Sequence, residues 1–175
     1  MGMMTSPRTF VYSDPHFGHE EIIRYFGRPF KSARAMDDEL IKSWNDVVAT
    51  EDSVFVLGDF SFLNQNKTRG IVSLLNGHKT LILGNHDRGQ NIQWWKDVGF
   101  DEVSPYPIIY GGFFILSHEP VFLSDAMPYV NIHGHLHTLS YDSKQYVNVS
   151  VEKTNYRPVL LDDIISRYKD QQGNG

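Results

Sequence analysis

The first hundred residues alternate short apolar runs with amphipathic stretches. Mostly apolar runs bounded by turn-forming residues predict buried strands, at Thr9–Ser13, Ser53–Leu57 and Thr80–Leu83. Apolar residues that recur every three or four positions between these runs predict helices, at Glu20–Phe26, Met36–Ala49, Lys67–Leu75 and Asn91–Val98. This half of the chain therefore predicts strands and helices in alternation.

The pattern changes after residue 100, where short strands separated by turns dominate. The predicted strands are Ile108–Tyr110, Phe113–Ser117, Tyr129–His133, Tyr146–Val151 and Val159–Leu161, followed by a helix at Asp162–Tyr168. We find no internal repeat, low-complexity tract or interdomain linker. A chain of 175 residues can bury one sizeable core, so we expect a single domain over residues 1–175 with frayed ends at 1–7 and 171–175.

Side chains that can bind metal ions follow the ends of five predicted strands. They are Asp14 and His16, Asp59, Asn85 to Asp87, His118, and His135 and His137. Ligands of open α/β sheets bind at the carboxyl ends of the strands, so we expect these side chains to meet at one edge. Glycines beside them, at Gly58, Gly84 and Gly134, let the backbone turn sharply and approach a ligand closely.

The donor atoms of these side chains favour transition metals. The candidate ligands are Asp14, His16, Asp59, Asn85, His118, His135 and His137. Mixed oxygen and nitrogen donors suit Mn²⁺, Fe²⁺ or Fe³⁺, Zn²⁺, Co²⁺ or Ni²⁺ better than Mg²⁺ or Ca²⁺. The chain has no cysteine, which excludes thiolate zinc sites, iron–sulfur clusters and disulfides. Seven ligands are too many for one ion, but they fit two ions roughly 3.5–4 Å apart that share a carboxylate. Asp59 is the natural bridge because it is the only carboxylate in its segment.

Charge and composition narrow the class of partner. The formal net charge is −5, so no broad basic surface is predicted, which argues against extended nucleic acid as a partner. A small anionic substrate such as a phosphate ester would have to be attracted locally, and metal ions could do that. No apolar run approaches the roughly 18 residues that would span a membrane. The segment Met1 to Arg8 lacks the apolar core of a signal peptide. We therefore expect a cytoplasmic protein, and the sequence does not indicate its oligomeric state.

Five polar segments occur in a fixed order along the chain: Asp14-Pro15-His16, Gly58-Asp59, Gly84-Asn85-His86-Asp87, Ser117-His118 and Gly134-His135-Leu136-His137. Each alone fits an ordinary turn or helix cap. Together and in order, they resemble the five motifs of the calcineurin-like metallophosphoesterases. The chain is similar in particular to short single-domain bacterial and phage members, with their D-P-H-F-G-H start (Asp14–His19) and N-V-x-V-E ending (Asn148–Glu152). It departs from many members in carrying Phe60-Ser61-Phe62 after Gly58-Asp59, where they have another acidic residue.

The resemblance implies an α/β fold, an αββα sandwich of two mixed sheets flanked by helices, with a dinuclear site at the strand ends. One ion would be held by Asp14, His16, Asp59 and His137, and the other by Asp59, Asn85, His118 and His135. His86 would face the substrate and protonate the leaving oxygen as a general acid. Asp87 would orient His86, as carboxylates do for catalytic imidazoles.

The predicted activity is hydrolysis of phosphate esters by metal-bound hydroxide. A phosphodiester is the preferred substrate class because a histidine acid helps most with a poor alkoxide leaving group. Phosphomonoesterase activity is the near alternative. A nuclease would need a positive track, and a non-catalytic scaffold of this fold would be expected to have lost site residues such as His86, which is present.

Three further side chains are candidates for binding the phosphate substrate. Arg28 and Arg88 could bind phosphate through their guanidinium groups, although surface salt bridges explain them equally well. His19 could reach the substrate or cap the helix that follows it. Of the remaining histidines, we interpret His133 as a core residue and His78 as a solvated one.

Overall fold

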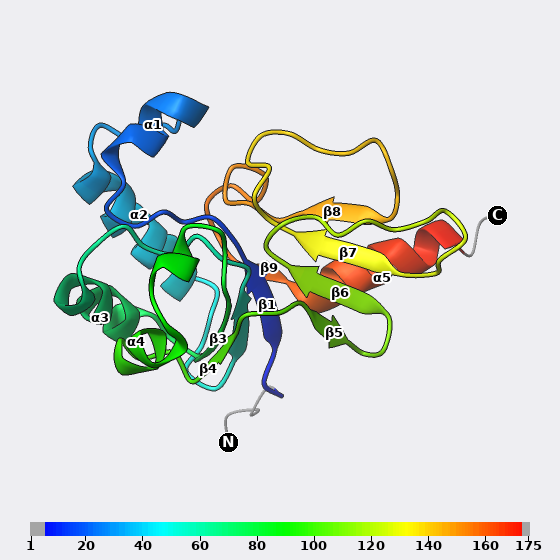
Figure 1. The fold of residues 1–175 in the computed structure, drawn as a ribbon, viewed down its shortest axis with the longest axis horizontal. Helices are drawn as coiled ribbons and strands as arrows, with labels where there is room; N and C mark the ends of the chain where they lie inside the picture. Colours follow the sequence, from blue (N-terminus) through cyan, green and yellow to red (C-terminus); the bar gives the residue numbers. More distant parts are fainter. Residues whose placement is uncertain (1–5, 173–175) are drawn as a thin grey trace, which may run out of the picture.

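A computed structural model of the chain describes residues 6–172 and contains two mixed sheets (Figure 1). Strands β1 (Thr9–Tyr12), β2 (Ser53–Val56), β3 (His78–Ile82), β4 (Glu102–Ser104) and β9 (Val159–Leu160) form a five-stranded sheet in the order β4-β3-β2-β1-β9. Strands β1 to β4 are parallel, and β9 runs antiparallel to β1.

The second sheet has four strands in the order β5-β6-β7-β8. They are β5 (Ile108–Tyr110), β6 (Phe114–Ser117), β7 (Val130–His133) and β8 (Tyr146–Asn148). Strands β6 to β8 are parallel, whereas β5 pairs antiparallel with β6. The predicted α/β fold with two mixed sheets is therefore confirmed.

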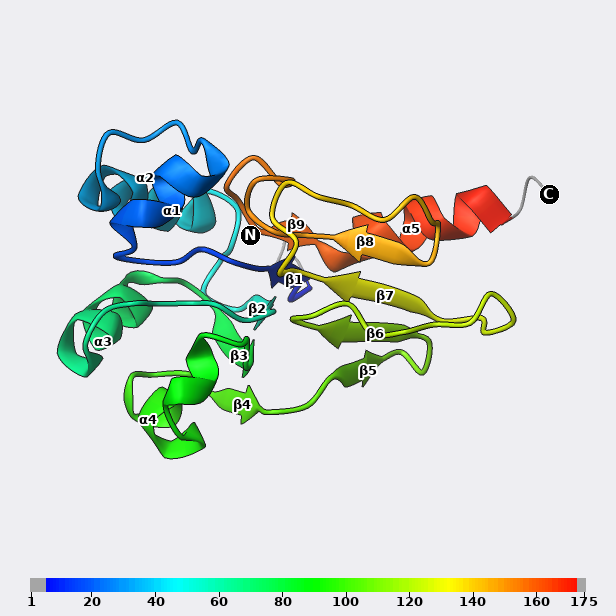
Figure 2. The ribbon, with the colours of Figure 1, turned by 45° about the horizontal axis from the view of Figure 1, so that its top comes forward.

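Helices cover the two sheets unequally. Four of them, α1 (Glu20–Phe26), α2 (Ala33–Asn45), α3 (Gln65–Leu74) and α4 (Ile92–Asp97), gather beside the five-stranded sheet, on the left of Figures 1 and 2. The last helix, α5 (Leu161–Gln172), lies along the four-stranded sheet.

The side chains of β1 show why the two sheets stack. Phe10 and Tyr12 pack into a core shared with the helices α1 to α4, whereas Val11 packs into a second core with Leu116 and Ile132 of the other sheet. The five-stranded sheet is thus buried on both faces, as a parallel sheet requires. This stacking holds the strand ends of the two sheets in a fixed relation.

Most predicted elements are present, and the differences have local causes. Helix α2 begins at Ala33, earlier than predicted, because the Ser32 hydroxyl accepts a hydrogen bond from Ala35 N–H (3.2 Å) and caps the helix. The strand predicted over Tyr146–Val151 ends at Asn148, and residues 151–156 form turns. Strand β4 was not predicted, since three residues carry no periodic signal. Helix α5 continues to Gln172, while 1–5 and 173–175 of the predicted frayed ends lie outside the described residues.

Candidate metal centre

The parallel strands of both sheets end at one place, and the predicted ligands lie just beyond those ends. Asp14 follows β1, Asp59 follows β2 and His118 follows β6. Backbone hydrogen bonds join the loops, since Asp14 N–H donates to Gly58 O (3.1 Å) and Gly134 N–H donates to His118 O (3.0 Å). In Figure 2 the arrowheads of β6 and β7 accordingly point toward the first sheet.

A first group of side chains could hold a metal ion between Asp14, His16 and His137. The Nε2 atoms of His16 and His137 lie 3.9 Å and 3.8 Å from Asp14 Oδ1. Asp14 Oδ1 and His16 Nε2 are buried, and neither has a hydrogen-bond partner among the described residues. Unpartnered buried polar atoms are costly, so their convergence fits a cation ligated by both. Burial lowers the pKa of His16 to about 2, although the negative charge of Asp59 raises it. The imidazole is therefore neutral at physiological pH, as a metal ligand must be.

A second group contains Asp59 and His118 and shares Asp14 with the first. Asp14, Asp59 and His118 form a buried triad that could bind metal. His118 Nε2 lies 3.4 Å from Asp59 Oδ2 and 2.9 Å from Asn85 Oδ1. His135 Nδ1 lies 3.0 Å from the same Asn85 oxygen. Oxygen and nitrogen donors of Asp59, Asn85 and His135 therefore gather around His118 Nε2.

Asp14 belongs to both groups, and Asp59, a member of the second, also contacts the first. Asp59 Oδ2 lies 3.5 Å from His16 Nε2 and 3.4 Å from His118 Nε2. Burial raises the pKa of this carboxyl, but the hydrogen bond and charge of His118 outweigh burial and lower it to about 2. For His118 burial lowers the pKa, while the contact with Asp59 outweighs burial and raises it to about 9. The carboxylate is thus ionised at neutral pH, and its Oδ2 faces both groups. The raised pKa of His118 means that its ring would have to release a proton to bind a metal ion.

Hydrogen bonds outside the two groups aim the ligand atoms inward. Asp14 Oδ2 accepts hydrogen bonds from the Ser13 hydroxyl (2.7 Å), the Ser150 hydroxyl (3.0 Å) and the backbone N–H of His135 (2.9 Å). Asp14 Oδ1 is thereby left available to a metal ion. His118 Nδ1 lies 2.8 Å from Leu57 O. Because that carbonyl can only accept, the ring donates from Nδ1 and presents Nε2 to the site.

His137 is oriented by Glu152, a residue to which the sequence analysis assigned no role in the site. The Glu152 carboxylate lies 3.0 Å from His137 Nδ1 and accepts two hydrogen bonds from the Arg28 guanidinium (2.7 and 2.9 Å). A carboxylate behind a ligating histidine fixes the ring and its tautomer. The N-V-x-V-E ending, Asn148–Glu152, was the available signal, but nothing in its pattern shows which histidine the glutamate meets.

The backbone of the ligand loops is unusual. Of the seven non-glycine residues with positive φ among those described, five are candidate ligands: Asp14, His16, Asp59, His135 and His137, with φ between 48° and 66°. Such conformations cost free energy in non-glycine residues and gather where function imposes them. The glycines between the loops permit close approach, since a Cβ on Gly84 would overlap the Asp59 carboxylate and one on Gly134 the Ser13 hydroxyl.

His86 lies at the rim of the site and in neither group. Its side chain is 48% exposed, and its Nε2 is 3.9 Å from Asp59 Oδ2. The backbone N–H of His86 donates to Asp59 Oδ1 (3.0 Å), which holds the loop of His86 to Asp59. The imidazole can therefore meet a bound molecule from the solvent side.

Asp87 does not orient His86 in this structure, which corrects the role implied by the resemblance. Its buried carboxylate accepts hydrogen bonds from the N–H groups of Asp59 (2.7 Å), Phe60 (3.0 Å) and Gly84 (2.8 Å). The chain enters a single helical turn at Asp87–Gly89, which directs the carboxylate inward and away from His86. Asp87 instead joins the loops that follow β2 and β3.

The three candidate phosphate-binding residues also make contacts within the protein. Arg28 is buried, and besides Glu152 its guanidinium donates to the carbonyls of Asp14 and Pro15 (2.8 Å each), so this placement does not support phosphate binding. Arg88 forms a bidentate pair with Glu119 (2.8 Å each) and remains 49% exposed.

His19 occupies the position that precedes helix α1, but its side chain makes no capping hydrogen bond. Its Nδ1 lies 3.1 Å from His16 Nδ1, and its ring stacks on Phe62. His133 is buried and His78 is 71% exposed, as expected. His19 is therefore the one candidate substrate-binding residue that directly contacts a candidate ligand ring.

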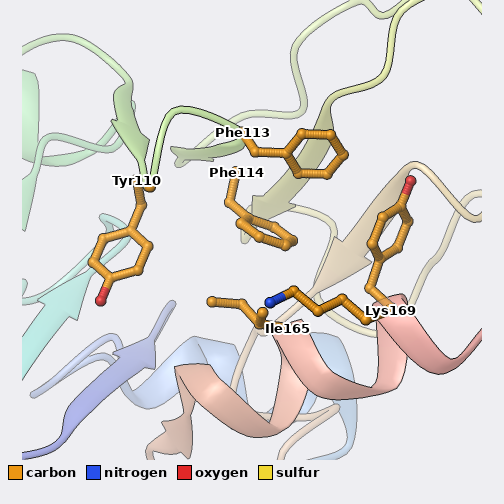
Figure 3. A pocket seen from close by; sticks show the side chains of 7 residues that line it. Tyr110, Phe113, Phe114, Ile165 and Lys169 are labelled. Carbon is orange, nitrogen blue, oxygen red and sulfur yellow. The ribbon is translucent and has the colours of Figure 1, made fainter.

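One concave surface away from the site lacks this chemistry. Figure 3 shows a pocket of about 430 Å³ between the β5–β6 hairpin and α5, lined by Tyr110, Gly111, Phe113, Phe114, Ile165, Tyr168 and Lys169. It has no carboxylate or imidazole in its lining and lies at the start of β6, whereas His118 follows the end of that strand. Within residues 6–172, none of the helices combines the length and apolarity needed to cross a bilayer.

The chain is similar in sequence to an archaeal protein and to a phage protein. No model of a known protein family matches the chain. The uncharacterized protein MJ1445 of Methanocaldococcus jannaschii is 35% identical over 172 residues, which cover 93% of this chain and 92% of that protein. The Gene 66 protein of Mycobacterium phage L5 is 35% identical over 85 residues, 45% of this chain and 39% of that protein.

A solved structure supports the fold. The crystal structure of the protein of unknown function AQ665 from Aquifex aeolicus matches with a TM-score of 0.71 and 27% identity, over 91% of this chain and 98% of that one. The fold is therefore one that occurs in an experimentally determined protein. By the extent and identity of its match, the chain belongs to the family of the uncharacterized protein MJ1445 of Methanocaldococcus jannaschii.

Proposed function

We propose that this protein is a dinuclear-metal-dependent phosphoesterase of the calcineurin-like metallophosphoesterase type, and that it hydrolyses phosphodiesters. The observation that carries the proposal is the position of Asp59 Oδ2, 3.5 Å from His16 Nε2 and 3.4 Å from His118 Nε2. One carboxylate oxygen shared by two sets of donors is the arrangement expected of a two-metal site.

The residues present fit two metal ions. One ion would be held by Asp14, His16, Asp59 and His137, and the other by Asp59, Asn85, His118 and His135. The unpartnered atoms Asp14 Oδ1 and His16 Nε2 support the first set, and the mutual approach of His118, Asn85 and His135 supports the second. Donors of this kind fit Mn²⁺, iron or Zn²⁺, with Co²⁺ or Ni²⁺ as alternatives. When bound, such a pair supplies an activated water and neutralises charge on the phosphate.

The protein's own contribution to bond cleavage would come from His86. It would donate a proton to the oxygen of the leaving group, which matters most when that group is a poorly stabilised alkoxide. Its half-exposed position beside Asp59 supports contact with a bound ester from the open side. Asp87 would position the loop of His86 through three backbone hydrogen bonds, without touching the substrate.

The protein is first stripped of metal with a chelator and then reloaded with Mn²⁺, Zn²⁺ or Fe²⁺. Each sample is assayed on bis-p-nitrophenyl phosphate and p-nitrophenyl phosphate. We expect two ions per chain by elemental analysis and faster turnover of the diester. His86→Gln should keep both ions and lose about 10²–10⁴-fold in kcat on the diester. Asp59→Asn should lose tight binding of both. His78→Gln, which alters an exposed histidine, is the control.

The same assay decides between the alternatives. Faster turnover of the monoester would assign a phosphomonoesterase, and cleavage of single-stranded DNA a nuclease. Two bound ions without turnover of any ester would assign a binding scaffold and overturn the proposal. Full activity of His86→Gln on the diester would remove the general-acid role and leave the metal site standing.

A further inference from the structure

An exposed aromatic ring stands beside the metal centre. Phe62 follows β2 and Asp59 in the chain and is 40% exposed, which is high for a phenylalanine next to buried polar groups. Its ring stacks on His19, with 4.0 Å between centroids and 19° between planes, and is nearly parallel to His16, with 5.1 Å and 16°. The exposed ring is therefore supported from the protein side.

The backbone holds this ring in place. Phe62 N–H donates to Phe17 O (2.9 Å), and Phe17 N–H donates to Phe60 O (2.9 Å). These bonds tie the segment after Asp59 to the segment after His16. Phe62 is thus fixed at the rim of the site by the same two loops that carry candidate metal ligands.

One face of Phe62 is free of both histidines. Rings on opposite faces of a third ring are separated by two contact distances, about 7 Å. The centroids of His16 and His19 are only 5.4 Å apart, so the two rings do not enclose Phe62 between them. Together with the 40% exposure, this leaves aromatic surface that a bound molecule can cover.

The open ring is next to the candidate general acid. The His86 ring lies 4.9 Å from Phe62, tilted by 51°, and 5.7 Å from His16. A group attached to the oxygen that His86 protonates would lie within reach of Phe62. Flat aromatic groups stack on such a ring favourably, whereas saturated groups of the same size gain less.

We propose that the site selects phosphate esters whose leaving group carries a planar aromatic ring, which stacks on Phe62. This inference rests on the proposed function, because it uses the position assigned to the leaving group. An aryl group and a nucleobase share the required chemistry. Phe62 would then determine specificity by binding the substrate.

The experiment measures binding of phosphonates, whose carbon–phosphorus bond is not hydrolysed. Benzylphosphonate is compared with cyclohexylmethylphosphonate, and the methylenephosphonate analogue of adenosine 5′-monophosphate with that of ribose 5-phosphate. Dissociation constants come from calorimetry on the Mn²⁺-loaded protein. We expect the aromatic member of at least one pair to bind about 5- to 100-fold more tightly, as stacking on an aromatic side chain provides. The pair that responds distinguishes an aryl from a nucleobase substrate.

Matched variants assign the preference to Phe62. Phe62→Leu should abolish it while leaving the saturated member's dissociation constant within about twofold, and Phe62→Tyr should retain it. Phe113→Leu makes the same change at the remote pocket of Figure 3 and should have no effect. If Phe62 only shields His16 from water, Phe62→Leu will instead weaken Mn²⁺ binding and both members equally, which would overturn the inference.

Turnover of bis-p-nitrophenyl phosphate is measured on the same samples. Turnover without an aromatic preference, or with a preference that survives in Phe62→Leu, overturns the inference and leaves the proposed function intact. Absence of both turnover and Mn²⁺-dependent phosphonate binding overturns the proposed function, and the inference with it.

Discussion

At the scale of single residues, each of the two aspartates of the centre uses its two carboxylate oxygens for different purposes. Asp14 Oδ2 accepts three hydrogen bonds from the protein, and Oδ1 accepts none among the described residues. Asp59 Oδ1 accepts from His86 N–H, while Oδ2 faces His16 and His118. One oxygen of each carboxylate is thus used for positioning, which leaves the other preorganised for a cation.

The support behind His137 gives a prediction about stability. Glu152→Gln removes the charge that faces the buried Arg28 guanidinium, and an uncompensated buried charge is expected to cost about 3–5 kcal/mol of unfolding free energy. Urea denaturation followed by circular dichroism measures it. Glu119→Gln, which breaks the exposed pair with Arg88, is the control and should cost no more than about 1 kcal/mol. Equal losses in the two variants would contradict the assignment of Arg28 as a buried support.

Asp37 gives a prediction about pH. Burial raises the pKa of its carboxyl to about 6, from an ordinary 3.8, against the hydrogen bond from Gly18 N–H. The folded protein therefore binds this proton more tightly than the unfolded chain, so stability falls as pH rises through this interval. The side chain introduced by Asp37→Asn does not titrate, so the variant does not lose this stability as the pH rises. The Tm of the variant minus that of the wild type should rise between pH 4 and 6 and be constant above 7. The exposed Asp142→Asn should show no such trend.

The candidate ligands show how far sequence alone reaches at this scale. Asp14, Asp59 and the histidines could be proposed because metal-binding side chains after strand ends form a recognisable order. The supports could not, because Arg28 and Glu152 are separated by 124 positions and meet only through the tertiary fold. Asp87 was assigned to the wrong partner for a related reason, since adjacency to His86 does not show where its carboxylate points.

At the scale of elements, the loops that follow β2 and β3 depend on one buried carboxylate. Asp87 accepts from the N–H groups of Asp59, Phe60 and Gly84, so the bridge residue and the loop of His86 share an anchor. The strands themselves were predictable, because a parallel strand buried on both faces is recognisable in sequence as a nearly continuous apolar run. The anchor was not, since its partners are backbone groups that any sequence would offer.

Asp87→Asn tests this anchor. An asparagine side chain has one acceptor oxygen and places an NH₂ group against the backbone donors. We expect a loss of about 1–3 kcal/mol in unfolding free energy and weaker Mn²⁺ binding, although no candidate ligand has changed. Thermal unfolding and a metal titration measure the two effects. Unchanged metal affinity in a destabilised variant would limit Asp87 to a purely structural role.

At the scale of the whole molecule, the centre joins the two sheets. Asp14 and Asp59 extend from the five-stranded sheet, and His118 and His137 follow strands of the four-stranded one. The cores on either face of β1 already hold the sheets together. Metal ions would add a second connection at the strand ends, where loops with positive φ meet and packing alone leaves polar atoms unpaired.

Metal removal should therefore lower the stability of the whole chain. An ion that binds only the folded state stabilises it by about 2.7 kcal/mol at a concentration 100 times its dissociation constant, which corresponds to a rise in Tm of roughly 5–10 °C for a domain of this size. Calorimetric scans after chelation and after addition of Mn²⁺ measure the shift. Asp59→Asn should lose most of it, because both groups depend on that carboxylate, whereas the exposed His78→Gln should keep it. A Tm that does not respond to Mn²⁺ in the wild type would mean that the unpaired atoms at the strand ends are not metal ligands.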